Sequence, residues 1–174
     1  AGVTVNGLKY VDSYDLSAGV AAPTGDNQHA LTVISTGVKK NLIGDFTGRV
    51  GVEYAVRPTL KDDLNSNFKL AYEKFSLVKP YASYGYDYNR KLHIAEAGLP
   101  IEYIFKNVPV VNTVTANVVA AYNYYQGDLN GVYQTAKFGG GLDIPVWGPI
   151  NLFAQGTYYR ALENSKVAFN EDWV

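Results

Sequence analysis

Several residue types are missing or scarce in this chain of 174 residues. Cysteine is absent, which excludes a disulfide framework and any thiolate metal site. Methionine is absent even at position 1, and the chain begins Ala-Gly-Val-Thr, so we expect a mature chain whose signal peptide has been removed. The two histidines, His29 and His93, lie far apart in the sequence, and we interpret them as strand-end or loop residues.

An excess of charge and a long apolar run are also lacking. The formal net charge of −1 argues against a groove for nucleic acid. No apolar run approaches the roughly 20 residues that a membrane-spanning helix needs. The chain is instead rich in tyrosine (15) and glycine (17), which are good strand and turn formers. This composition favours an all-β chain, and its length fits a single domain over residues 1–174.

Apolar and polar residues alternate along residues 46–57, FTGRVGVEYAVR. One set of alternate positions is apolar and aromatic, whereas the other carries Arg49, Glu53 and Arg57. Because side chains of a strand alternate between its faces, this pattern predicts a β-strand with one apolar and one charged face. The same period recurs, least clearly in the first of these segments, along residues 30–39, 8–20, 68–75, 81–88, 96–105, 113–124, 135–144 and 150–159.

Turn-forming sequences separate these segments, and no helical period persists for a full helix length. The predicted turns lie at residues 23–27, 41–45, 61–65, 78–80, 89–91, 107–109, 126–130 and 147–149. Glycine and proline inside the segments suit the bends of a closed barrel better than an open sheet. The sequence therefore predicts an antiparallel up-and-down β-barrel of about 8–10 strands with short connections.

The two faces differ in a way that points to lipid outside the barrel. The apolar face combines small residues with Tyr and Phe near strand ends, as in a transmembrane barrel with aromatic girdles. The polar face carries both signs of charge, which a small barrel can pair in its interior. The predicted lipid-facing residues are Val50, Val52, Leu99, Ile101, Val118 and Leu142. The predicted aromatic girdle comprises Tyr10, Tyr54, Tyr72, Tyr88, Tyr103, Phe105, Tyr122, Tyr124 and Tyr158. The predicted lumen ion-pair network comprises Arg49, Glu53, Arg57, Lys69, Glu73, Glu102, Lys137 and Asp143.

The segments SLVKPYASYGYDY, AGLPIEYIFKN and GGGLDIPVWGPINLFAQGTYY resemble hairpins of small bacterial outer-membrane barrels, the OmpA/OmpX/opacity-type porin superfamily. The resemblance rests on a repeated style of small residue, glycine and tyrosine with proline in short turns. It implies a barrel in the outer membrane of a diderm bacterium, reached through the periplasm. The chain departs from this group by ending Phe169-Asn-Glu-Asp-Trp-Val174 instead of in a strand that closes on a terminal aromatic residue.

Catalytic and metal chemistry find little support in the sequence. No serine lies in a nucleophile-elbow setting, and no glycine loop for phosphate is present. Acidic turn residues such as Asp62 and Asp63 lack the ligand spacing of a calcium loop. We interpret Glu53 and Glu73 as members of an ion-pair network and not as a general acid and base. We therefore expect no enzyme, no catalytic residue, no metal and no cofactor.

Three functions compete at this point. The first is an outer-membrane barrel with a structural, anchoring or narrow-pore role, bound by membrane lipids and filled by charged side chains. The second is a soluble lipocalin-like barrel that binds a small apolar ligand, and the third is an outer-membrane lipase or acyltransferase. The sequence leaves open the solute, the oligomeric state and any protein partner.

Overall fold

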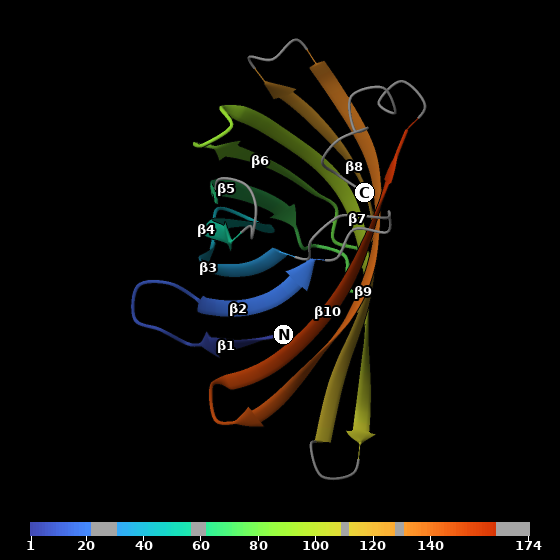
Figure 1. The fold of residues 1–174 in the computed structure, drawn as a ribbon. Coiled ribbons are helices and arrows are strands. Elements are labelled where there is room, and N and C mark those ends of the chain that lie inside the picture. Colours follow the sequence, from blue (N-terminus) through green and yellow to red (C-terminus); the bar gives the residue numbers. More distant parts are fainter. Residues whose placement is uncertain (22–30, 57–61, 109–111, 128–130, 163–174) are drawn as a thin grey trace.

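The computed structural model describes residues 1–21, 31–56, 62–108, 112–127 and 131–162. Over these ranges the chain forms ten antiparallel strands that close into one barrel, each paired with its neighbours in sequence (Figure 1). The strands are β1 (Gly2–Asn6), β2 (Ser13–Ala21), β3 (Leu31–Asn41), β4 (Phe46–Val56), β5 (Asp63–Tyr72), β6 (Tyr81–Asp87), β7 (Leu92–Val108), β8 (Asn112–Gly127), β9 (Gly131–Trp147) and β10 (Ile150–Ala161). The predicted all-β, up-and-down barrel is confirmed, with ten strands. In the described part of the chain, no helix has the length and apolar character needed to cross a membrane.

The barrel closes where Gly2–Val5 of β1 pairs with Ile150–Phe153 of β10. At this seam Gly2 lies opposite Phe153, and a Cβ on Gly2 would lie 2.4 Å from the Phe153 ring. Because glycine has no side chain, the ring lies over the neighbouring strand, a contact that fixes the register of the closure.

Neighbouring strands are staggered around the barrel. Following the paired residues from Val5 of β1 through β2 to β9 leads to Gln134, which lies beside Leu162 just after the end of β10. Across the closing seam, however, Val5 pairs with Ile150 at the start of β10. One circuit therefore advances 12 residues, from position 150 to position 162. Ten strands with this stagger tilt by about 40° from the barrel axis. Opposite walls accordingly cross at a steep angle, with β1–β5 on one side and β7–β10 on the other (Figure 1).

Burial alternates along the strands as the sequence pattern predicts. In β4 the side chains of Thr47 and Ala55 are buried inside the barrel, whereas Val50 and Val52 on the outer face are exposed. The inner set of β4 is the one that carries its charges, Arg49 and Glu53. The barrel thus has a polar inside and an apolar outside.

Several predicted boundaries are wrong. The segment predicted at residues 68–75 already ends at Tyr72, and β7 continues to Val108, into the turn expected at residues 107–109. Residues 8–20 were expected to form one strand, but a connection occupies residues 7–12, in which Gly7 has a φ of 71° and its N–H donates to the carbonyl oxygen of Asp12. This connection separates β1, which the pattern did not predict, from β2. A turn was expected at residues 61–65, but β5 already starts at Asp63, because the β4–β5 hairpin extends further than its polar sequence suggests.

The connections define two ends of the barrel. End 1 carries the connections at residues 7–12, 42–45, 73–80 and 148–149, and end 2 carries the connection at residues 88–91. The strands β7, β8 and β9 have 17, 16 and 17 residues, compared with 9 to 11 in β2–β5. In Figure 1 the long strands form a tall wall beside the shorter ones.

Candidate functional site: the charged lumen

Three cationic side chains stand side by side on the inner wall. The register places Lys39 of β3 opposite Arg49 of β4, and Arg49 opposite Lys69 of β5. Neighbouring strands lie about 4.8 Å apart, so three like charges follow one another directly across the sheet. Like charges in this arrangement are destabilising unless anions compensate them.

This register corrects part of the predicted network. Arg49, Glu53, Lys69 and Glu73 were expected to pair with one another across β4 and β5. Instead Arg49 faces Lys69, and Glu53 faces Asn65, with which it forms a side-chain hydrogen bond. The compensating carboxylates come from strands further along the wall, because a long cation reaches across its neighbour to the next strand. The remaining predicted member, Arg57, lies outside the described residues.

Arg49 is held by two strands and lies over two glycines. Its Nε and Nη2 atoms donate to the two carboxylate oxygens of Asp15 on β2, at 3.0 and 2.5 Å, and its Nη1 donates to Asn67 on β5 at 3.2 Å. Such two-point contacts between arginine and carboxylate are strong and directional. A Cβ on Gly37 or Gly51 would lie 2.5 or 2.7 Å from the guanidinium nitrogens. The paired glycines therefore leave the space in which the guanidinium lies along the wall.

Lys39 and Glu73 form a second pair towards end 1. The Lys39 Nζ atom lies 2.6 Å from the Glu73 carboxylate, to which Thr47 also donates at 2.8 Å. Glu73 lies one residue beyond the end of β5, in the β5–β6 connection. Burial by itself would raise the pKa of Glu73, but the hydrogen bonds from Lys39 and Thr47 outweigh it and lower the pKa below its usual value.

A second cluster, on strands β5–β9, is built around Glu96 of β7. Its carboxylate oxygens lie 3.1 and 3.0 Å from Lys137 on β9, and the Tyr81 hydroxyl on β6 donates to it at 2.5 Å. The Lys69 ammonium lies 3.7 Å from the centre of the Tyr81 ring, a cation–π contact. The Tyr81 ring in turn covers Gly98, where a Cβ would lie 2.5 Å from the ring carbons. One carboxylate thus serves the Lys137 ammonium and Tyr81, and Lys69 is held by the ring.

The remaining predicted lumen residues lie towards end 1. Glu102 of β7 forms an ion pair with Lys79 of the β5–β6 connection. Asp143 of β9 accepts a hydrogen bond from Asn151 of β10 at 2.7 Å. These contacts join the inner faces of β7 and β9, near end 1, to the β5–β6 connection and to β10.

The structure adds polar residues that the predicted network did not include. Asp15, Lys39 and Glu96 provide most of the ion pairs described above. The signal for Asp15 and Glu96 was present in the sequence, because both fall on the polar side of their segments. Lys39 gave no such signal, because both faces of residues 30–39 are mixed. At end 2, Arg90 lies 3.0 Å from the buried Asp63, and the backbone N–H of Arg90 donates to the buried Asp87.

The outer face carries the residues that were predicted to meet lipid. The six predicted side chains all lie on outward positions, with exposed fractions between 44% for Val52 and Ile101 and 56% for Val118. Some outward polar groups are satisfied within the wall. Thr36 donates to the carbonyl oxygen of Asp15 at 3.0 Å, and the Tyr84 hydroxyl lies 2.5 Å from Nδ1 of His93. His93 is the second residue of β7, near a strand end as expected, whereas His29 lies outside the described residues.

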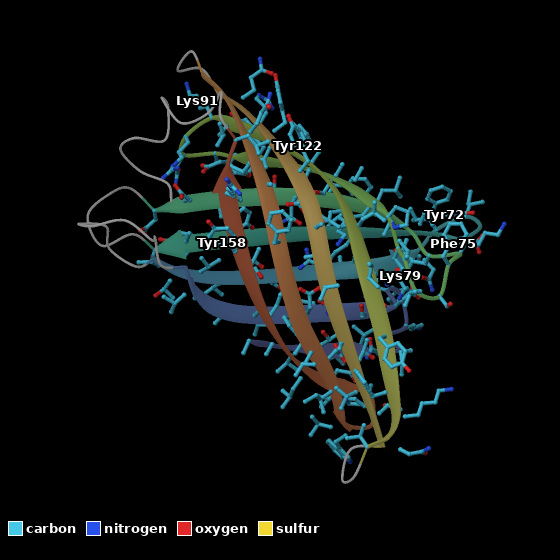
Figure 2. The ribbon with its side chains drawn as sticks, turned by 90° about the vertical axis from the view of Figure 1, so that its right-hand side faces the viewer. Tyr72, Phe75, Lys79, Lys91, Tyr122 and Tyr158 are labelled. Carbon is cyan, nitrogen blue, oxygen red and sulfur yellow. The ribbon has the colours of Figure 1, made fainter. Side chains whose placement is uncertain are left out.

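The nine predicted girdle residues fall into two groups by the direction of their strands. Those near end 1 are Tyr10, Tyr72, Tyr103 and Phe105. Those towards end 2 are Tyr54, Tyr88, Tyr122, Tyr124 and Tyr158. Figure 2 shows Tyr72 and Lys79 at one end of the barrel and Lys91 and Tyr122 towards the other. Tyr10 belongs to the connection at residues 7–12 and not to a strand, and 74% of its surface is exposed.

No known protein family, curated protein or solved structure matches this chain.

Proposed function

We propose that this chain is an integral β-barrel of the outer membrane of a diderm bacterium, with a structural, anchoring or narrow-pore role. The main support for the proposal is that the hydrophobic side chains lie on the outside of the barrel, whereas most proteins bury them inside. Among the described residues, 35 large hydrophobic side chains are exposed, whereas the buried hydrophobic ones are Ala55 and Tyr81. In water a barrel with so small an apolar interior would leave its hydrophobic surface without a partner, and a lipid surrounding supplies one.

Strand length and tilt support the same conclusion. A transmembrane strand tilted by about 45° needs roughly 9–11 residues. The strands β2–β5 have 9 to 11 residues, and the stagger of the barrel gives a tilt of about 40°. Closure pairs Gly2–Val5 of β1 with Ile150–Phe153 of β10, so the sheet has no free edge along this seam, as a lipid-exposed wall requires. The hairpin style shared with the OmpA/OmpX/opacity-type superfamily supports this assignment.

The contents of the lumen favour a filled or narrow interior over a wide channel. The guanidinium of Arg49 and the ring of Tyr81 lie across the wall over glycines, and Lys137 and Glu96 bridge β7 and β9. A soluble carrier of an apolar ligand needs an apolar cavity, whereas this inner wall carries charged side chains. A lipase or acyltransferase needs a nucleophile beside a histidine, and the described histidine, His93, points outward beside Tyr84.

The central test is detergent dependence together with spin-label accessibility. The folded protein should need detergent and should show a heat-modifiable gel mobility. Spin labels at Val52 and Leu99 should collide with lipid-soluble oxygen, and a label at Arg49 should not. The reverse pattern of accessibility would contradict the proposal.

A pair of matched arginine substitutions sharpens this test. Val52→Arg puts a cation on the outer face in mid-strand, where it costs roughly 2–4 kcal/mol in a membrane. Ile43→Arg makes the same change at the tip of the β3–β4 connection, where Ile43 is 92% exposed and the cost is about 0–1 kcal/mol. Insertion into vesicles should be impaired for the first variant alone.

Planar-bilayer recordings separate the pore from the purely structural role. If the charged side chains narrow a pore, Glu53→Gln and Arg49→Gln should raise its conductance. Unchanged conductance with reduced stability in both variants would favour the structural role. Unchanged conductance with unchanged stability would mean that these side chains are simply solvated.

A further inference from the structure

The β5–β6 connection, residues 73–80, forms part of the outer wall at end 1. It lies beside the stretch of β7 that extends past the start of β6. The N–H of Lys79 donates to the carbonyl oxygen of Pro100 at 3.2 Å, and the N–H of Glu102 donates to that of Leu77 at 2.8 Å. Val78 pairs with Ile101 as an isolated bridge. The connection is therefore fixed to β7 by backbone bonds.

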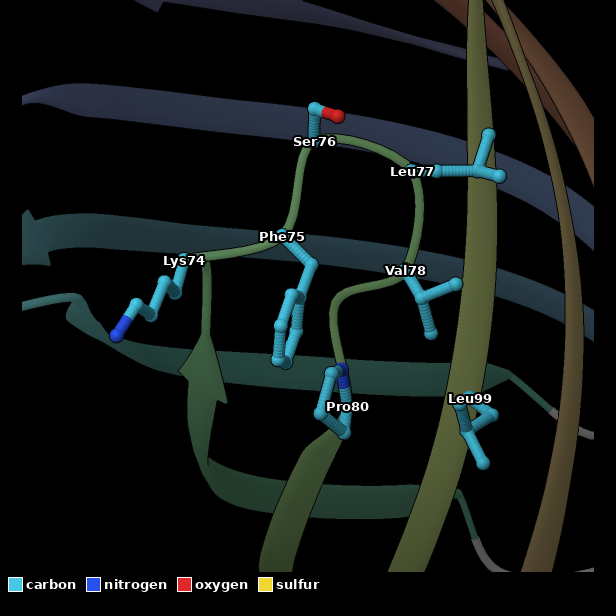
Figure 3. A pocket seen from close by; sticks show the side chains of 7 residues that line it. All are labelled: Lys74, Phe75, Ser76, Leu77, Val78, Pro80 and Leu99. Atoms are coloured by element: carbon cyan, nitrogen blue, oxygen red, sulfur yellow. The ribbon is translucent and has the colours of Figure 1, made fainter.

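An open apolar groove of about 830 Å³ lies between this connection and β7. Its lining residues are Lys74, Phe75, Ser76, Leu77, Val78, Pro80 and Leu99 (Figure 3). Phe75, Leu77 and Leu99 are 55%, 49% and 54% exposed, although they belong to the wall of the groove. The volume falls within the range of about 300–1,000 Å³ that is typical of small-ligand sites.

One border of the groove is an aromatic stack on the outer face. The ring of Phe75 meets that of Tyr72 edge-on, with centres 5.8 Å apart, and Tyr72 meets Phe46 at 5.0 Å. Tyr72 belongs to the aromatic group at end 1, so the groove lies at the depth where aromatic side chains mark a membrane interface.

The charge at the groove comes from Lys74. Within the described residues, the carboxylate Glu102 is paired with Lys79, and no ion pair involves Lys74. In Figure 3 the Lys74 side chain extends away from the apolar lining. A lysine at an interface extends its ammonium towards the headgroups and is attracted by anionic lipid.

We propose that this groove binds one acyl chain of an anionic phospholipid, with the Lys74 ammonium on its phosphate. The inference rests on the proposed membrane location. Lipid is the occupant that the site fits, because the apolar lining continues the outer face at Leu99 and the free cation complements a phosphate. The described connection at end 2, Tyr88–Lys91, does not line this groove, so a lysine there provides a comparison for Lys74.

Native mass spectrometry of the detergent-solubilised protein tests the proposal, with dioleoyl phosphatidylglycerol as the probe and dioleoyl phosphatidylcholine as the neutral comparison. The wild-type protein should retain one phosphatidylglycerol in preference to phosphatidylcholine. Lys74→Gln should lower the retention of phosphatidylglycerol about fivefold, the effect of one lysine at an anionic surface. Leu77→Asn should lower the retention of both lipids, because it changes the apolar lining.

Lys91→Gln, which removes the same charge from the connection at end 2, is the matched control and should leave retention unchanged. An equal loss in Lys91→Gln and Lys74→Gln would mean general attraction of anionic lipid and would overturn the specific site. A barrel that needs detergent and is heat-modifiable, yet retains no lipid, would overturn this inference and leave the proposed function intact. A protein that is folded and monomeric without detergent would overturn both.

Discussion

The two charge clusters of the lumen compensate their cations in different ways. In the Arg49 cluster each cation has its own carboxylate, since Arg49 binds Asp15 and Lys39 binds Glu73. In the Glu96 cluster one carboxylate binds Lys137 and also accepts from Tyr81, while the Lys69 ammonium lies on the Tyr81 ring. Both clusters place a large side chain over glycine, a guanidinium over Gly37 in the first and a ring over Gly98 in the second.

The difference shows how the row of three cations is tolerated. Glu73 of the β5–β6 connection compensates Lys39, and Asp15 of β2 compensates Arg49. The ammonium of Lys69, the last cation of the row, lies on the face of the Tyr81 ring, and the Tyr81 hydroxyl donates to the carboxylate of Glu96. We therefore expect the Arg49 cluster to depend on charge pairing and the Glu96 cluster to depend on the packing of Tyr81.

The largest effect is expected from Asp15→Asn. This change leaves Arg49 without its carboxylate between Lys39 and Lys69, and breaking a fully buried pair costs roughly 3–5 kcal/mol. Because the two side chains retain 15% and 28% of their exposure, we expect a loss of about 2–3 kcal/mol in the free energy of unfolding. Urea unfolding in lipid vesicles, followed by gel mobility, measures it. The double variant with Arg49→Gln should recover part of the loss, and no recovery would contradict the pairing.

Gly98→Ala tests the dependence of the second cluster on packing. The added methyl group would lie 2.5 Å from the Tyr81 ring, which is rigid and held by Glu96, so we expect a loss of about 1–3 kcal/mol. Gly37→Ala should cost less, because the flexible guanidinium of Arg49 can move aside. Gly156→Ala is the control, since a Cβ there has no heavy atom within 4 Å. If Gly37→Ala costs more than Gly98→Ala, the proposed difference between the clusters is wrong.

Glu96→Gln tests the charge of the second cluster and should have a smaller effect than Asp15→Asn. Glutamine still accepts the hydrogen bond from Tyr81, and Lys137 lies opposite Ala121 and Tyr159 instead of between two cations, so we expect a loss of about 1–2 kcal/mol in unfolding free energy. The same urea experiment measures it, with Glu96→Gln/Lys137→Gln as the compensating variant. A loss as large as that of Asp15→Asn would show that the two clusters depend on charge equally.

The smallest effect is the pH dependence that Glu73 contributes. Since the folded protein lowers the pKa of Glu73 below its usual 4.5, the stabilisation is complete above that value and is lost as the pH falls through the folded pKa. Glu73→Gln should therefore be less stable than the wild type at pH 7, by less than about 1 kcal/mol, and the difference should shrink below about pH 4. A stability difference that does not change between pH 7 and pH 3 would contradict the assigned hydrogen bonds.

The sequence predicted some parts of this picture well because they depend on local periodicity. Val50 and Val52 were assigned to the opposite face from Arg49, and the structure places them so, because a strand alternates its side chains whatever its neighbours are. Pairing between strands was predicted less well. The partner of Arg49 was sought on β5, the adjacent strand, whereas the structure provides Asp15 on β2.

Two features of the site required the three-dimensional structure. The row of Lys39, Arg49 and Lys69 depends on the register of three strands, which a shift of one residue would abolish. The groove beside Leu99 depends on how far β7 extends past β6 and on the connection that bonds to it. Neither the register nor the relative strand lengths can be obtained from the period of each segment alone.

The sequence by itself determined the all-β class, the two faces of each strand and the residue types on each face, because these follow from a two-residue period and from turn-forming residues. The tertiary structure decided the strand number, the stagger and the partner of every lumen charge. These depend on closure, since the first residues of β10, Ile150–Phe153, meet β1 only when the registers of all the strand pairs add up to the observed stagger.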